Sequence, residues 1–212
     1  MHIVVSREDY FAAARTVLAE DGVSGLKIGT LCKALNVTSG SFYGYFGSLQ
    51  GFIDEFLADW EAEQVARIRR QGTVDGDIRA QMQSLKALAE GLPHEAEAAL
   101  RGWAHINKAV EAVQERLDAR RKTMLVEHFT PLVGPERAHA LAVAGMAMLI
   151  GVQQWRRPAV QGDFDMLFAE FERLLEAEEA RRGRVRDLEC NKDYVTDVRG
   201  GAGTDDVTED RR

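Results

Sequence analysis

The chain has 212 residues, of which 27 are Lys or Arg and 34 are Asp or Glu, so its formal net charge at pH 7 is −7. This length suggests one compact domain or two small ones, and a hydrophobic fraction of 45% is ordinary for a globular protein. The negative charge excludes a general electrostatic attraction to nucleic acids or anionic lipids, so any nucleic-acid binding has to be local.

The longest apolar run covers residues 138–152 and is interrupted by His139. A membrane-spanning helix needs roughly 20 apolar residues, and the N-terminus lacks the basic and apolar regions of a signal peptide. Cys32 and Cys190 lie far apart and form no disulfide or metal-binding pattern, which fits a reducing compartment. We therefore expect a cytoplasmic protein that does not span a membrane.

The N-terminal third of the chain predicts four helices. The first begins after Ser6, which together with Asp9 gives a capping-box pattern, and it stops at Gly22. Two short helices are expected at residues 27–35 and 38–46, with Asn36 between them because Asn tolerates the left-handed conformation of a tight turn. A longer helix begins after Ser48, with an apolar stripe formed by Leu49, Phe52, Ile53, Phe56, Leu57 and Trp60.

The remainder of the chain is also predicted to be helical, and strand-like alternation is absent from the sequence. Amphipathic helices are expected at about residues 76–90, 94–105, 107–129, 135–157 and 163–182. From Gly183 the sequence is polar and non-periodic, which predicts a mostly disordered tail over residues 183–212. The predicted fold is therefore all-α, with an N-terminal domain over residues 6–60 and a helical bundle over residues 76–182.

The two short helices at residues 27–46 make a helix-turn-helix motif, in which the second helix enters the major groove of DNA. Val37, Phe42 and Phe46 are expected to pack inward. The side chains expected to point outward are those of Thr38, Ser39, Ser41, Tyr43 and Tyr45, while Gly40 and Gly44 let the backbone approach DNA. Hydroxyls and helix N-terminal amides bind phosphates well. The candidate DNA-binding residues are Lys27, Lys33, Thr38, Ser39, Gly40, Ser41, Tyr43, Gly44, Tyr45 and Ser48.

The segment from Val37 to Phe46 resembles the hallmark segment of the TetR family of transcriptional regulators. The residues that match are Val37, Thr38, Gly40, Phe42, Tyr43, Tyr45 and Phe46. The resemblance covers residues 6–60 closely and the helical remainder loosely. It implies a homodimer that binds a pseudo-palindromic double-stranded DNA operator and responds to a small-molecule effector, usually as a repressor. It also implies that the last two long helices, at about residues 135–157 and 163–182, form the dimer interface.

Two departures from the family pattern concern charge. Ser39 and Leu49 stand where the family often has a basic residue, and residues 1–50 hold four basic and four acidic side chains. Because phosphate neutralisation supplies most non-specific affinity, we expect weak DNA binding with a shallow salt dependence. An alternative is a TetR-like dimer with degenerate DNA binding that acts through small-molecule or protein binding.

The helical bundle offers a weaker prediction of a ligand pocket. Its candidate residues are Trp103, His105, Met124, His128 and Met146, each of which also fits ordinary core packing. The five histidines are scattered, so no metal site and no cofactor are predicted. A helical enzyme would require a catalytic constellation, which the sequence does not offer, and we therefore expect a protein without enzymatic activity.

Overall fold

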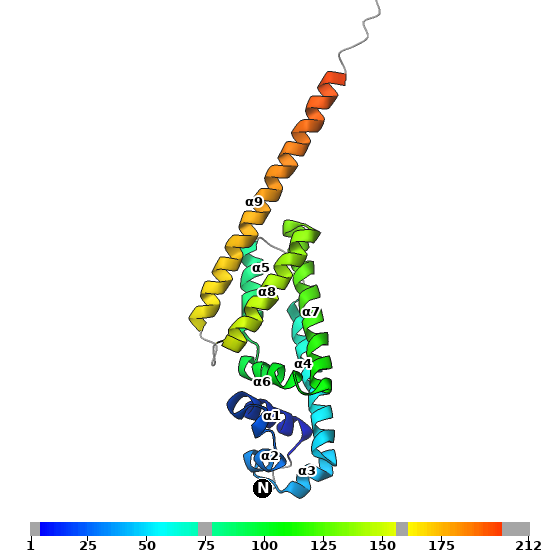
Figure 1. Ribbon diagram of the computed structural model, residues 1–212, viewed down its shortest axis with the longest axis vertical. Helices are drawn as coiled ribbons and strands as arrows, with labels where there is room; N and C mark the ends of the chain where they lie inside the picture. Colours follow the sequence, from blue (N-terminus) through cyan, green and yellow to red (C-terminus); the bar gives the residue numbers. More distant parts are fainter. Residues whose placement is uncertain (1–4, 72–77, 156–160, 201–212) are drawn as a thin grey trace, which may run out of the picture.

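The computed structural model describes residues 5–71, 78–155 and 161–200, and this part of the chain contains helices and turns but no strand. Figure 1 shows an elongated molecule, with a small helical domain at one end and a bundle of longer helices at the other. The fold predicted from the sequence, all-α with an N-terminal helix-turn-helix joined through a long fourth helix to a helical bundle, is confirmed.

The small domain is built from α1 (Arg7–Asp21), α2 (Ile28–Leu35), α3 (Ser39–Phe46) and the first half of α4 (Leu49–Gln71). Ser6 caps α1 through the expected capping box with Asp9. Asn36 ends α2 with φ 53°, the left-handed conformation that brings α3 across α2.

An aromatic core holds these short helices together. The side chains of Tyr10, Phe42 and Phe52 are completely buried, and the Tyr10 and Phe42 rings meet edge to face at 5.7 Å. The Phe46 ring lies 5.0 Å from that of Phe52. Because α2 and α3 are too short to be stable alone, this packing fixes the angle at which α3 is presented.

The long α4 leaves the small domain and enters the bundle, where it packs against α7 (Lys108–Val133). The bundle also contains α5 (Ile78–Glu90), α6 (His94–Ala104), α8 (Pro135–Trp155) and α9 (Gln161–Gly200). Its core includes Phe129, Phe171 and Leu175. In Figure 1, α6 lies between the bundle and α1, which it contacts.

Two helices in the bundle extend beyond the ranges expected from the sequence. Helix α7 continues past residue 129 and includes Pro131, which was expected near a helix boundary. Helix α9 continues to Gly200, past Gly183, where the sequence predicts that a disordered tail begins; residues 201–212 lie outside the described residues. A single glycine costs a helix only about 1 kcal/mol, and no proline follows Pro158 to stop it. None of the helices in the described ranges is long and apolar enough to cross a membrane.

Candidate nucleic-acid interface and ligand cavity

Helix α3 has one buried face and one exposed face. Phe42 and Phe46 point into the aromatic core, as expected. Ser39, Gly40, Tyr43 and Gly44 are exposed on the other face, and the side chain of Tyr43 is 52% exposed. This face carries an aromatic hydroxyl, a serine hydroxyl and two residues without side chains, so a DNA groove could approach its backbone closely.

Two of the residues expected to point outward are instead engaged inside the domain. The Tyr45 hydroxyl donates to the carbonyl of Val5, and its ring packs on Tyr10. Ser41 is half-buried, and its Oγ accepts a hydrogen bond of 3.3 Å from the Tyr10 hydroxyl. The expectation of an outward orientation is therefore wrong for Ser41 and Tyr45, because α1 and the segment before it cover this side of α3.

The remaining candidate residues lie at the edges of the exposed face. Thr38 stands at the N-cap position of α3 and is exposed, but its side chain makes no capping hydrogen bond. The Ser48 Oγ accepts from the backbone N–H of Gly51 at 2.9 Å and so caps α4. Between α3 and α4, Gly47 has φ 67°, a backbone conformation that residues other than Gly rarely adopt.

The basic residues of this domain fall into two pairs with different surroundings. Arg7 forms an ion pair with Glu55, and Arg15 forms ion pairs with Asp59 and Glu63 of α4. Lys27 and Lys33 are exposed and have no ion-pair partner among the described residues. Since residues 5–60 contain no other Lys or Arg, these two lysines are the cations available to phosphates.

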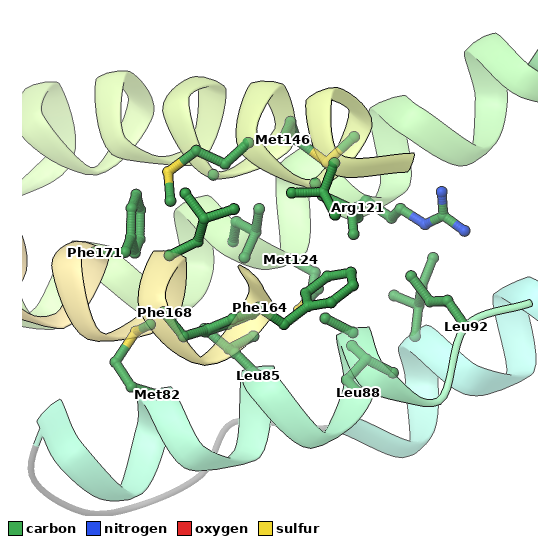
Figure 2. A pocket seen from close by; sticks show the side chains of 18 of the residues that line it. Met82, Leu85, Leu88, Leu92, Arg121, Met124, Met146, Phe164, Phe168 and Phe171 are labelled. Atoms are coloured by element: carbon green, nitrogen blue, oxygen red, sulfur yellow. The ribbon is translucent and has the colours of Figure 1, made fainter. Parts of the chain in front are cut away.

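A cavity of about 830 Å³, counting its opening to solvent, lies between α4, α5, α7, α8 and α9. Figure 2 shows its long axis, with Met82 and Phe171 toward one end and Arg121 and Leu92 toward the other. Its wall is almost entirely aliphatic, aromatic and methionine side chains. An apolar hollow between helices with a few polar groups is typical of small-molecule sites.

The predicted pocket residues are divided between this cavity and other places. Met124 and Met146 line it. Trp103 is buried in the core shared with the N-terminal domain, and His105 lines a separate hollow beside Arg101. His128 lies in another hollow of α7, where its Nδ1 is 3.1 Å from the carbonyl of Met124.

A buried polar network at one end of the cavity was not predicted from the sequence. Arg121 of α7 forms an ion pair with Glu97 of α6, and the two side chains are 5% and 0% exposed. The second guanidinium nitrogen is 3.4 Å from Oε1 of Gln64 on α4. Gln153 of α8 donates to the other oxygen of Glu97 at 2.9 Å and lies 3.2 Å from Nδ1 of His94, whose pKa is lowered by burial.

This network joins four helices, and α6 in turn packs on α1 of the small domain. The sequence carries one indication of this network. Gln64 follows Trp60 by one helical turn, so a polar side chain occupies the buried stripe of α4. Arg121 follows the buried Leu117 in the same way. The sequence alone does not show that the buried stripes of α4 and α7 face each other.

The geometry defines a helix-turn-helix protein in which an aromatic core fixes α3, and in which a second, helical domain encloses an apolar cavity. Residues 11–56 match the family model described as bacterial regulatory proteins, tetR family. The N-terminal domain is thus similar to that of the TetR family, as the motif from Val37 to Phe46 predicts. No curated protein sequence matches the chain.

Solved structures similar to this chain are bacterial transcriptional regulators. A regulator from Rhodococcus sp. Rha1 is 17% identical with a TM-score of 0.64, covering 84% of this chain and 95% of that one. A second, described as a TetR-family regulator from Rhodococcus sp., is 15% identical with a TM-score of 0.61, covering 82% and 98%. A third, from Saccharomonospora viridis in complex with choline, is 14% identical with a TM-score of 0.65, covering 80% and 95%. The whole chain therefore has the TetR-like regulator fold.

Proposed function

We propose that this protein is a sequence-specific DNA-binding transcriptional regulator, acting in the cytoplasm as a ligand-responsive repressor. The observation that carries the proposal is the exposed face of α3, where Ser39, Tyr43 and the backbone at Gly40 and Gly44 are free of the core. Tyr43 would reach base edges or the phosphate beside them. Lys27 and Lys33 would bind phosphates on either side of the groove.

The regulator would act as a homodimer on a pseudo-palindromic operator. Helices α8 and α9 expose large apolar side chains, including Val143, Met166 and Leu174, which are 48%, 59% and 52% exposed. A second copy of this chain packed on α8 and α9 would cover them. The two α3 helices must then lie about 34–36 Å apart to enter successive major-groove turns.

Ligand binding would change this spacing through α4 and α6. A molecule in the cavity would contact Gln64 of α4 directly and Arg121 of α7, which holds Glu97 of α6. A shift of either helix would move the small domain, because α4 belongs to it and α6 packs on α1. The Saccharomonospora viridis regulator of this fold is in complex with choline, which supports a small-molecule effector here.

The test begins with selection of binding sequences from random DNA by the full-length protein. The selected duplex and a scrambled one are then compared by fluorescence anisotropy, with wild-type protein and a Tyr43→Ala, Lys27→Ala variant. We expect an enriched inverted repeat that the wild type prefers and the variant does not. A matched variant, Lys108→Ala, removes an exposed lysine of the bundle and should bind the operator normally.

One observation favours the alternative of a TetR-like dimer with degenerate DNA binding. Arg7 and Arg15 are held in ion pairs, so each protomer offers DNA only two free lysines from this domain. In that case random DNA would give no enriched sequence, and the protein would act through its cavity or a protein partner alone.

A further inference from the structure

The polar groups of the cavity are concentrated at one end. Gln64, Arg67 and Arg121 are the polar residues of its lining, and all three belong to α4 or α7. No Asp or Glu is among the lining residues of this cavity, because Glu97 and Glu63 bind the two arginines from outside it. The lining residues at this end therefore supply hydrogen-bond donors and no carboxylate.

Some of these donors have no partner in the described structure. Gln64 is 1% exposed, and its Oε1 is oriented toward Arg121 at 3.4 Å. This orientation leaves the Nε2 of Gln64 without an acceptor among the described residues. The Nε of Arg67 is likewise buried without an acceptor, while its two other nitrogens bind the Gly91 carbonyl at 2.7 Å and Glu63 at 2.8 Å.

A buried donor without an acceptor is costly, and native proteins rarely leave one unless another molecule satisfies it. The acceptor best matched to the Gln64 amide and the Nε–H of Arg67 is an anion with two oxygens, because charge-assisted hydrogen bonds are the strong ones. A cationic head group would find unpartnered donors and no carboxylate among the lining residues. The far end, by contrast, offers only apolar contacts such as Met82 and Phe171 (Figure 2).

We propose that the effector cavity binds an elongated apolar carboxylate, with the carboxylate at Gln64 and Arg67 and the hydrocarbon toward Met82 and Phe171. This inference rests on the cavity being the effector site of the proposed regulator, and it names the chemical class of the effector. The carboxylate would take the unpartnered hydrogens of α4, beside the Arg121–Glu97 pair that reaches α6. Methionines along the wall would adapt to chains of different shape.

The test is isothermal titration calorimetry on the full-length protein without DNA. The probes are straight-chain carboxylates of increasing length, the primary alcohols of the same length and the corresponding alkyltrimethylammonium ions. We expect carboxylate affinity to rise about fourfold per added methylene until the apolar end is filled. At equal length, the carboxylate should bind at least about tenfold more tightly than the alcohol, and the ammonium ion should not bind.

Variants locate the head group. Gln64→Leu and Arg67→Met should each weaken carboxylate binding about tenfold or more and leave alcohol binding nearly unchanged. The matched control is Gln114→Leu, since Gln114 is a buried glutamine of α7 with an equally unpartnered Nε2 but lies outside this cavity. It should bind carboxylates as the wild type does. Arg121 is not substituted in this test, because its loss would leave the buried Glu97 carboxylate without a cation.

Equal binding of alcohols and carboxylates would overturn the proposal, as would preference for the ammonium ion or an unchanged affinity in both Gln64→Leu and Arg67→Met. The absence of binding by any chain length would also overturn it, and would indicate that water satisfies these donors. Because no DNA is present, these results are independent of the regulator's operator binding. Failure to select an operator would refute the proposed regulator while leaving carboxylate binding intact.

Discussion

The buried ion pair between Arg121 and Glu97 gives the sharpest stability prediction. Replacing Arg121 by Met keeps an unbranched side chain but removes the guanidinium group, which leaves the Glu97 carboxylate, 0% exposed, without its cation. Its remaining hydrogen bond, from Gln153 at 2.9 Å, does not neutralise the charge. Stranding a buried charge in this way costs about 3–5 kcal/mol, out of a total free energy of unfolding of about 5–15 kcal/mol.

The double variant Arg121→Met, Glu97→Gln removes both charges and keeps an acceptor for Gln153. We expect it to recover at least about 2 kcal/mol relative to Arg121→Met, since an ion pair and its uncharged replacement are often close in stability. Urea denaturation followed by far-ultraviolet circular dichroism measures the four proteins of the cycle. One fixed protein concentration is used, because the proposed dimerisation would make stability concentration-dependent.

The matched control is the Arg116–Glu61 pair, whose side chains are 51% and 21% exposed. The double-mutant cycle of this exposed pair should give a coupling free energy of about 1 kcal/mol or less. Two results would contradict this prediction for the buried pair. One is a free energy of unfolding for Arg121→Met within about 1 kcal/mol of the wild type. The other is a double variant whose loss of stability equals the sum of the losses of the two single variants.

Three further outcomes are expected. Phe42→Ala should cost about 3–5 kcal/mol, because it empties the centre of the aromatic core, and should abolish DNA binding; a normal melting curve would contradict this. Removing Lys27 and Lys33 should reduce the slope of log K against log salt by about one for each phosphate that is no longer neutralised, measured by anisotropy; an unchanged slope would place both lysines off the DNA. The pKa of Asp9 is lowered by hydrogen bonds from Ser6, so the capping box stabilises the domain above the unfolded pKa of Asp9 and loses this effect as pH falls through the lowered value. Asp9→Asn should therefore be less stable than wild type at neutral pH and approach it in acid, as thermal melts across pH would reveal.

The sequence was informative wherever the signal is local. The capping box at Ser6, the left-handed Asn36 and the inward positions of Phe42 and Phe46 each depend on residues within one or two helical turns. The motif from Val37 to Phe46 was sufficient to identify the DNA-binding domain because its spacing reflects both the core side and the open side of α3.

What the sequence could not give depends on contacts between distant segments. The Tyr45 hydroxyl is turned inward by Val5, and a sequence pattern does not tell which tyrosine of a helix finds such a partner. Gln64 and Arg121 are separated by 57 residues and become neighbours only when α4 and α7 pack together. A glutamine or arginine on an apolar stripe looks like a break in the stripe until the facing helix is known.

The measurement that tests the central claim most directly is the affinity of the full-length protein for its selected duplex and for a scrambled duplex, with Tyr43→Ala beside the wild type. If α3 reads the operator, the wild type discriminates between the duplexes, and Tyr43→Ala, which removes an exposed side chain without opening the core, loses this discrimination. Equal affinity of the wild type for both duplexes, or an unaffected Tyr43→Ala, would contradict the assignment of α3 as the reading helix.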